Sequence, residues 1–245
     1  MDEPILRSQS FQTQLQGLTV VIPCYKEDPK FLTETYCELS MRGAEVIIVD
    51  DGDTMDLPDE LNKRTYFPNM GYGYAIKHGI KHASNPVICT ADGDGQHSVE
   101  DICKMYTVYQ LIPNCKMLVG CRWNLNEKPL RWMGRKVLNF IASCIAGHYL
   151  IDLNSGMRIF TRTEAEGYAP ILCDTFSFTT SLTMSMVSDN HKVAWFPIDV
   201  KPRMQGKSHV RVVKDGLITV YYIVWIGLAL KTRKLRQWLR KKPIQ

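Results

Sequence analysis

The stretch 87–97 constrains the fold of this chain more than any other. An apolar, β-branched run, Val87–Ala91, leads directly into two carboxylates one residue apart, Asp92 and Asp94, with glycines beside them. An apolar run bounded by turn formers predicts a buried strand that leaves its sheet here. On extended backbone, side chains two residues apart point the same way, so both carboxylates can reach one hard cation. Because an isolated pair of this kind is often only a polar turn, its meaning depends on the flanking segments.

Three other apolar runs predict strands, and each is followed by residues that could bind a ligand: 18–22 before Pro23, 45–49 before Asp50-Asp51, and 116–121 before Arg122. Helical patterns at about 29–42, 74–83 and 99–111 separate these strands. The alternation predicts an α/β fold of the Rossmann-like kind, with a mostly parallel sheet flanked by helices. In such sheets ligands bind beyond the carboxyl ends of the strands. The aspartates and Arg122 should therefore converge at one edge.

The domain boundaries follow from composition. Residues 1–17 are polar and predict a flexible lead-in without a signal-peptide core. Residues 18–215 predict one domain, whose second half contains a helix near 131–147, a short strand after Arg158 and a late strand at 193–197. A basic, glycine-containing loop at 201–209 is suited to phosphate.

The C-terminal stretch 216–245 differs in composition from the rest of the chain. Its first fifteen residues, 216–230, are uncharged and rich in Ile, Val, Tyr and Trp, and seven Lys or Arg follow without any acid. A bilayer span needs roughly twenty apolar residues. The stretch therefore predicts C-terminal amphipathic helices that associate with a membrane surface. The alternative is a helix packed on the core or on a second subunit, so a homo-oligomer stays open.

The eight cysteines lie far apart, with no CxxC pair and no zinc-type spacing. Several, such as Cys24, Cys89 and Cys121, lie within apolar runs, where cysteine behaves as a small hydrophobe. This usage predicts a cytosol-facing protein. A nucleic-acid partner is not expected, because no base-reading motif accompanies the basic residues.

Seven motifs occur together in one order, and they are Val21-Ile22-Pro23-Cys24-Tyr25-Lys26-Glu27, Val49-Asp50-Asp51-Gly52, Asn69-x-Gly71-x-Gly73-x-Ala75, Asp92-x-Asp94-x-Gln96-His97, Gly120-Cys121-Arg122, Asp152-x-x-Ser155-Gly156-x-Arg158 and Arg203-x-x-Gly206-Lys207-Ser208. Each is weak alone. Together they resemble family 2, GT-A-type glycosyltransferases, and within that family the dolichol-phosphate mannose and other polyprenyl-phosphate sugar synthases. The resemblance covers about residues 18–215.

The resemblance implies a role for each matched residue. Nucleotide-sugar binding falls to Pro23, Tyr25, Glu27, Asp50, Asp51, Gly71, Gly73, Asp92 and Lys207. Mg²⁺ or Mn²⁺ would be bound by Asp92, Asp94 and Gln96, whose oxygens suit hard cations. The acceptor phosphate would contact Arg122, Arg131, Arg135, Ser155 and Arg158. The residues expected to act in catalysis are Asp92, Asp94, Arg122 and Arg203.

The expected acceptor depends on whether a base is present. An alcohol must lose a proton during attack, whereas a lipid phosphate is already anionic. Family members with hydroxyl acceptors carry an acid just after the segment that matches 176–178, where this chain has Thr179, Thr180 and Ser181. We therefore expect an inverting transfer from GDP-mannose or a UDP-sugar to a polyprenyl (dolichyl or undecaprenyl) phosphate at the cytosolic membrane face. Asp174 keeps a hydroxyl acceptor open as the alternative.

Two other interpretations remain at this point. One is a membrane-tethered protein that binds a sugar nucleotide without catalysis, which the intact Asp92/Asp94/Gln96 set disfavours. The other is a nucleotidyltransferase, which would need a glycine-rich triphosphate loop near its N-terminus. The chain also departs from the family pattern at Tyr72, where a basic residue is common.

Overall fold

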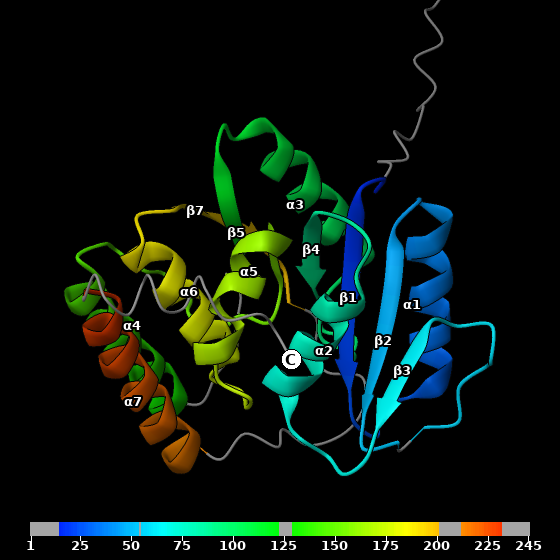
Figure 1. Ribbon diagram of the computed structural model, residues 1–245, viewed down its shortest axis with the longest axis horizontal. Helices are drawn as coiled ribbons and strands as arrows, with labels where there is room; N and C mark the ends of the chain where they lie inside the picture. The colour runs from blue at the N-terminus through cyan, green and yellow to red at the C-terminus, as the bar shows by residue number, and fades with distance from the viewer. Residues whose placement is uncertain (1–14, 54, 123–128, 201–211, 232–245) are drawn as a thin grey trace, which may run out of the picture.

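The computed structural model describes residues 15–53, 55–122, 129–200 and 212–231 (Figure 1). Seven strands form one sheet in the order β3-β2-β1-β4-β6-β5-β7. The strands are β1 (Leu18–Cys24), β2 (Glu45–Asp51), β3 (Lys63–Tyr66), β4 (Val87–Thr90), β5 (Cys115–Arg122), β6 (Arg158–Thr161) and β7 (Lys192–Ile198). The α/β fold predicted from the sequence is confirmed.

One strand, β6, runs against the others. It pairs antiparallel with both β4 and β5, whereas the remaining pairs are parallel. Its first residue, Arg158, pairs with Thr90 of β4 and with Val119 of β5. The amino end of β6 therefore lies at the edge where the parallel strands have their carboxyl ends. This direction places the 152–158 motif beside Asp92.

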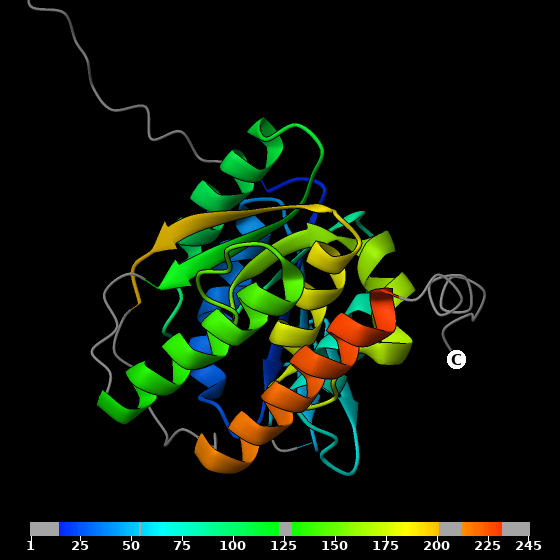
Figure 2. The ribbon, with the colours of Figure 1, turned by 90° about the vertical axis from the view of Figure 1, so that its left-hand side faces the viewer.

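Helices cover both faces of the sheet. On one face lie α1 (Pro29–Met41) and α3 (Val99–Leu111). The other face carries α2 (Tyr72–His82), α4 (Pro129–Ala146), α5 (Arg162–Tyr168) with the 3₁₀ turn Ala169–Ile171, α6 (Phe178–Ser188) and α7 (Val212–Lys231). Figure 2 shows α4 and α7 side by side on the outside of this layer.

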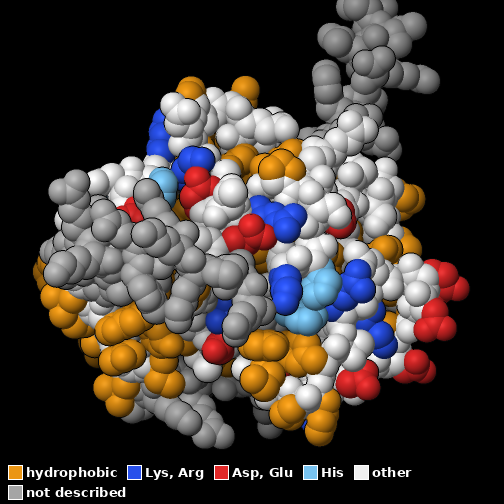
Figure 3. Space-filling model, viewed as in Figure 1, with side chains coloured by type: hydrophobic (Ala, Val, Ile, Leu, Met, Phe, Trp, Pro, Cys, Tyr) orange, Lys and Arg blue, Asp and Glu red, His pale blue; other side chains and the backbone are white. Residues whose placement is uncertain are grey.

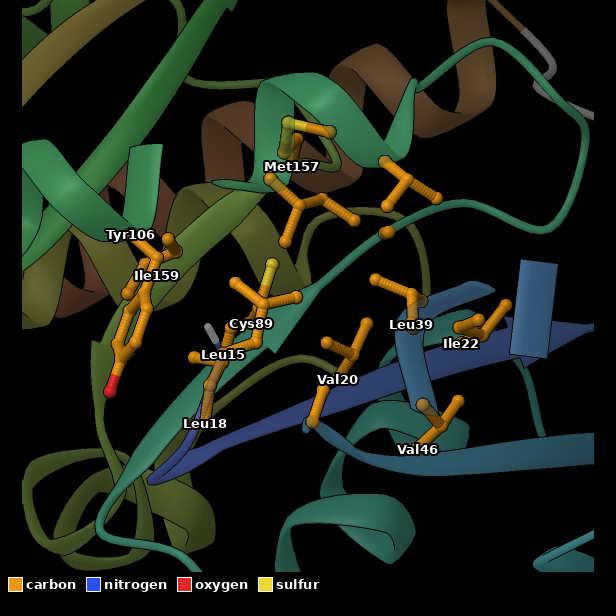
Figure 4. Packing of buried hydrophobic residues seen from close by; sticks show 14 of the residues in the cluster. Leu15, Leu18, Val20, Ile22, Leu39, Val46, Cys89, Tyr106, Met157 and Ile159 are labelled. Carbon is orange, nitrogen blue, oxygen red and sulfur yellow. The ribbon is translucent and has the colours of Figure 1, made fainter. Parts of the chain in front are cut away.

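Alternation along the strands builds a core on each face. Val20 and Ile22 of β1 point toward α1 and α3, while Val21 between them points toward α2. Figure 4 shows the first of these cores, in which Leu39, Tyr106 and other apolar side chains cover β1, β2 and β4. Because both faces of the sheet are covered, its central strands are continuous apolar runs.

Local signals set the ends of the helices. Asp28 caps α1 by accepting the N–H of Lys30, and Pro29 occupies the first turn. Ser98 caps α3 by accepting the N–H of Asp101 at 3.1 Å. These helices begin within a residue or two of where the sequence predicted them. The short strand β3, with no apolar run, was not predicted.

The apolar stretch 216–230 lies within α7, as expected. No helix in the described part of the chain, α7 included, has both the length and the hydropathy that a bilayer crossing requires. The basic stretch after 231 and the loop at 201–209 lie outside the described residues.

Candidate active site

The carboxylates predicted at the carboxyl edge do lie there together. Asp50 and Asp51 end β2, and Asp94 follows β4, and all three are almost fully buried. Acids from two motifs lie close to the same thiol. Burial raises the pKa of Cys24, and so do the charges of Asp50, Glu27 and Asp51. The structure thus gathers the acids of the first two motifs around the end of β1.

Both carboxylates at the end of β2 accept backbone N–H groups. Asp50 Oδ2 accepts from Met55 N at 3.0 Å. Asp51 accepts from Met70 N at 2.7 Å through Oδ1 and from Gly71 N at 2.8 Å through Oδ2. Gly71 is the N-cap residue of α2, with φ at +102°. Asp51 therefore fixes the glycine-rich turn that opens α2, where a negative charge is also favoured.

The turn after β4 packs against the loop after β1. A Cβ on Gly93 would lie 3.2 Å from Leu32, 3.4 Å from Cys24 Cβ and 3.5 Å from Glu27 Cγ. Tyr25 and Lys26 form the rest of that loop, with the Lys26 ammonium 5.0 Å from the Tyr25 ring centroid. The first motif and the Asp92-Gly93-Asp94 motif are therefore in contact, as their predicted shared role requires.

Asp92 and Asp94 are held in different ways. Asp94 Oδ1 accepts from Gln96 N at 3.0 Å, closing the turn on itself. Asp92 accepts the hydroxyl of Tyr72 at 2.9 Å, and its own N–H donates to His97 Nδ1 at 3.2 Å. Asp92 remains partly exposed, whereas Asp94 is 6% exposed.

Gly156 lies directly against Asp92. A Cβ on Gly156 would stand 2.4 Å from both carboxylate oxygens of Asp92. The glycine is held in place by its carbonyl, which accepts the Thr90 hydroxyl at 2.7 Å. Only glycine fits here, because any side chain would displace the carboxylate.

The arginine at the end of β5 is bound to one carboxylate. Arg122 Nε donates to Asp152 Oδ2 at 2.9 Å, and its Nη2 donates to Oδ1 at 2.8 Å. This fork geometry is the strong, directional form of the pair. Burial acts to raise the pKa of Asp152, but Arg122 and the nearby Arg135 hold it below its ordinary value.

Arg158 is fully buried rather than open to a ligand. Its guanidinium donates to the carbonyls of Ser155 and Leu153 and to the Thr183 hydroxyl. Burial lowers the pKa of Arg158 to about 10, so it keeps its charge at neutral pH, next to Asp152. Its hydrogen bonds are internal, which favours a positioning role for Arg158 over the direct phosphate contact that was expected.

The segment between the 3₁₀ turn and α6 packs beside the site, against the opening of α2. A Cβ on Gly73 would lie 2.2 Å from the Cys173 carbonyl oxygen, so the opening of α2 packs on this backbone. Asp174, the candidate base for an alcohol, is exposed and forms an ion pair with Lys77. Thr179, Thr180 and Ser181 are buried in α6.

The oxygen donors after β4 fit a divalent cation. Within the described residues, no three His, Cys, Asp or Glu side chains lie close enough to form a complete metal cage. Mg²⁺ is commonly bound by one or two carboxylates together with substrate phosphates and water, so a complete cage is not required. Asp92 and Asp94, with the Gln96 amide oxygen, provide such an incomplete set.

Some predicted residues cannot be placed in this geometry. Arg203 and Lys207 lie outside the described residues, and so does the side chain of Arg131. Ser155 is fully buried, and its hydroxyl has no hydrogen-bond partner among the described residues. Two site residues received no role from the sequence, namely Asp152 and Tyr72. The sequence signal for Asp152 was its place at the start of the 152–158 motif. The signal for Tyr72 was that it stands between two glycines, where the family commonly has a basic residue.

The sequence matches one known protein family over most of its length. A family model for glycosyl transferase family 2 matches residues 19–165, more than half of the chain. An uncharacterized protein of Methanocaldococcus jannaschii is 31% identical over 173 residues, which are 65% of this chain and 70% of that protein. Glycosyltransferase AglJ of Haloferax volcanii is 24% identical over 212 residues, covering 82% of this chain and 68% of AglJ.

A third relative has a named lipid substrate. The undecaprenyl-phosphate 4-deoxy-4-formamido-L-arabinose transferase of Salmonella choleraesuis is 24% identical over 188 residues, or 66% of this chain. The aligned part spans only 57% of that transferase's length.

Among solved structures, the fold resembles that of glucosyl-3-phosphoglycerate synthase from Mycobacterium tuberculosis, crystallised with Mn²⁺, uridine diphosphate and phosphoglyceric acid. The TM-score is 0.68 at 12% identity, and the match covers 86% of this chain and 78% of that one. This likeness concerns the fold alone. Together with the family match over residues 19–165, it identifies the chain as a member of glycosyltransferase family 2, a glycosyltransferase with the GT-A fold.

Proposed function

We propose that this glycosyltransferase moves a sugar from a nucleotide sugar, GDP-mannose or a UDP-sugar, to a polyprenyl phosphate, with inversion at the anomeric carbon. The observation that carries the proposal is the cluster of Arg122, Arg135 and Arg158 around Asp152. Asp152 anchors Arg122 at the carboxyl end of β5 through two hydrogen bonds, and Arg135 lies close to the same carboxylate. Because guanidinium groups bind phosphate oxygens well, this cluster suits an acceptor that is itself a phosphate.

The donor would bind on the carboxylate side. Glu27, Asp50 and Asp51 surround the end of β1, where their oxygens can accept hydrogen bonds from the base and ribose. Asp92, Asp94 and Gln96 would hold Mg²⁺ or Mn²⁺ near the diphosphate. A bound divalent cation would offset the charge that builds on the nucleoside diphosphate leaving group.

The acceptor needs no base in this scheme. A phosphate oxygen of the lipid attacks the anomeric carbon, while the bond from that carbon to the nucleoside diphosphate breaks. The diphosphate leaves with the bonding electron pair, and no proton has to be removed. The absence of an acid at 179–181 and the ion pair between Asp174 and Lys77 both support this scheme. The relatives named as undecaprenyl-phosphate transferases support it as well.

We further propose that the outer face of α4 and α7 rests on the membrane that holds the acceptor. α7 exposes large apolar side chains at helical spacing, and these are Leu217, Tyr221, Val224 and Leu228. The adjacent α4 exposes Trp132, Met133, Val137 and Phe140. Figure 3 shows apolar side chains gathered where α7 lies, at the lower left. Two neighbouring helices with such a face suit an interfacial position at the cytosolic side.

A transfer assay tests the proposed reaction. Purified protein receives radiolabelled GDP-mannose, UDP-glucose or UDP-GlcNAc with Mn²⁺ and a short polyprenyl phosphate. Three variants accompany it: Asp94→Ala, which removes a proposed metal ligand, Asp174→Asn, and Gly167→Ala as a neutral control. A Cβ on Gly167 would meet no atom within 4 Å, so its substitution should change nothing.

The expected result is label in the lipid product with one donor, lost without Mn²⁺ and in Asp94→Ala but kept in Asp174→Asn. A second outcome, donor hydrolysis without lipid product, would contradict the lipid acceptor. If Asp174→Asn then abolished transfer to a glycan or glycolipid hydroxyl, Asp174 would be the base and the acceptor an alcohol.

A further inference from the structure

Tyr72 links the two sides of the site. It lies between Gly71 and Gly73 as the first residue of α2, and its hydroxyl donates to Asp92 Oδ1 at 2.9 Å. Its ring stacks on Phe176, with centroids 5.6 Å apart and planes 22° from parallel. One side chain therefore contacts both a proposed donor carboxylate and the segment 173–177.

The backbone around Tyr72 is fixed on both sides. A Cβ on Gly71 would lie 2.8 Å from the Asp174 carbonyl oxygen, and the Tyr74 N–H donates to that same oxygen at 3.0 Å. On the other side, Asp51 holds the N–H groups of Met70 and Gly71. The backbone of Tyr72 is therefore held rigidly, and this allows its hydroxyl to fix the orientation of the Asp92 carboxylate.

The hydroxyl acts as a hydrogen-bond donor at any ordinary pH. A tyrosine hydroxyl has an ordinary pKa of about 10, so it remains protonated at neutral pH. A protonated phenol gives Asp92 Oδ1 a donor without adding charge. Gly156 packs closely against the same carboxylate. These two contacts restrict the carboxylate to one orientation.

We propose that Tyr72 is a positioning residue that orients Asp92 for the divalent cation and the donor diphosphate bound with it. The inference rests on the proposed donor site. A cationic side chain in the place of Tyr72 would compete with the metal for Asp92, whereas a neutral phenol leaves the negative charge available. The hydroxyl, rather than the ring stack on Phe176, carries this role.

Calorimetric titration with MnCl₂ and either UDP or GDP tests the proposal without needing the sugar or the acceptor. Tyr72→Phe keeps the ring and removes only the hydroxyl. Loss of a hydrogen bond to a charged group predicts binding of nucleotide plus Mn²⁺ that is weaker by about tenfold or more. Nucleotide binding without Mn²⁺ should stay as in the wild type, which also shows that the variant is folded.

Phe176→Leu is the matched variant, since it removes the stacking partner and leaves the hydroxyl in place. We expect its Mn²⁺-dependent affinity to remain close to that of the wild type. Equal losses in Phe176→Leu and Tyr72→Phe would overturn the inference, as would an unchanged affinity in Tyr72→Phe. If the wild type itself bound neither nucleotide, the proposed donor site would fail instead, which keeps the two failures distinguishable.

Discussion

The two halves of the candidate site are built on opposite plans. On the proposed donor side, Asp50 accepts the backbone N–H of Met55, and Asp51 accepts those of Met70 and Gly71 at the opening of α2. On the acceptor side, the guanidiniums of Arg122 and Arg158 donate to a carboxylate and to backbone carbonyls. The carboxylates of the first half are thus held by backbone donors, whereas the guanidiniums of the second half are held by a carboxylate and by backbone acceptors.

The difference shows how carboxylates and guanidiniums can both be held in place within one site. Asp51, which accepts two backbone N–H groups, is held in place by the turn that opens α2. Asp152 fixes Arg122 through two hydrogen bonds and lies close to Arg158. The two halves meet at Gly156, whose Cα touches Asp92 while its neighbour Ser155 accepts from Arg158.

The strongest way to break this meeting point is Gly156→Ala. The added methyl would stand 2.4 Å from both Asp92 oxygens, so the carboxylate must turn away. We expect sugar transfer to fall by about a hundredfold or more, the scale seen when reacting groups move by about 1 Å. The rate of transfer measures the effect, and Gly167→Ala is the control.

Circular dichroism separates a local from a global effect in that experiment. The fold should persist, because Asp92 is partly exposed and can swing toward solvent. Transfer by Gly156→Ala at the wild-type rate would show that the orientation of Asp92 does not matter, and would weaken the Tyr72 inference too.

Asp152→Asn tests the acceptor half. It leaves the buried Arg158 and the half-buried Arg122 without their shared counter-charge, and removing one partner of a buried pair costs about 3 kcal/mol or more of unfolding free energy. Denaturant unfolding measures the loss. Glu166→Gln breaks a more exposed pair with Arg162, so it should cost less than about 1 kcal/mol.

The effect of Asp152→Asn should also depend on pH. Because the folded-state pKa of Asp152 lies below its unfolded value of about 3.9, its stabilisation is complete above that value. It is lost as pH falls through the folded pKa. The gap between wild type and variant should be constant at neutral pH and narrow below about pH 4. A constant gap down to about pH 2 would contradict the assignment.

A smaller effect tests the face of α4 and α7 that we propose contacts the membrane. Cys37 on α1 and Cys144 on α4 are exposed, while the other six cysteines are buried, so a maleimide should label two of eight thiols. Cys144 lies four residues after Phe140, on the same stretch of α4. Anionic vesicles should slow labelling of Cys144 and leave Cys37 on the opposite face unchanged. Equal rates at both thiols with vesicles would argue against contact through α4.

Much of this arrangement could be predicted from the sequence. The alternation of strands and helices was enough for the fold class. The polar residues at or just after the carboxyl ends of β2, β4 and β5 were enough to place Asp50, Asp92 and Arg122 at one edge. The apolar character of Cys24, Cys89 and Cys121 was also confirmed, because all three are buried thiols. These features depend on local pattern and on a general rule about parallel sheets.

Other features depend on contacts that no local pattern shows. The direction of β6 is set by pairing with β4 and β5, and that direction buries Arg158 under the site. An arginine in a motif resembling a phosphate site gives no sign of this burial. Tyr72 likewise gains its meaning only from Asp92, twenty residues later, and from Phe176, far along the chain.

The pairing of β6 bears on the order in which the two halves of the site can form during synthesis. Arg158 of β6 pairs with Thr90 of β4 and with Val119 of β5. These two strands are synthesised before β6, which pairs between them. A chain still emerging from the ribosome can close β1 with β2 and β4, yet it has neither Gly156 against Asp92 nor a counter-charge for Arg122. Because long-range pairing forms slowly, we expect the proposed donor half to form before the proposed acceptor half. The site therefore lacks Asp152 and Gly156, which lead into β6, until that strand lies between β4 and β5.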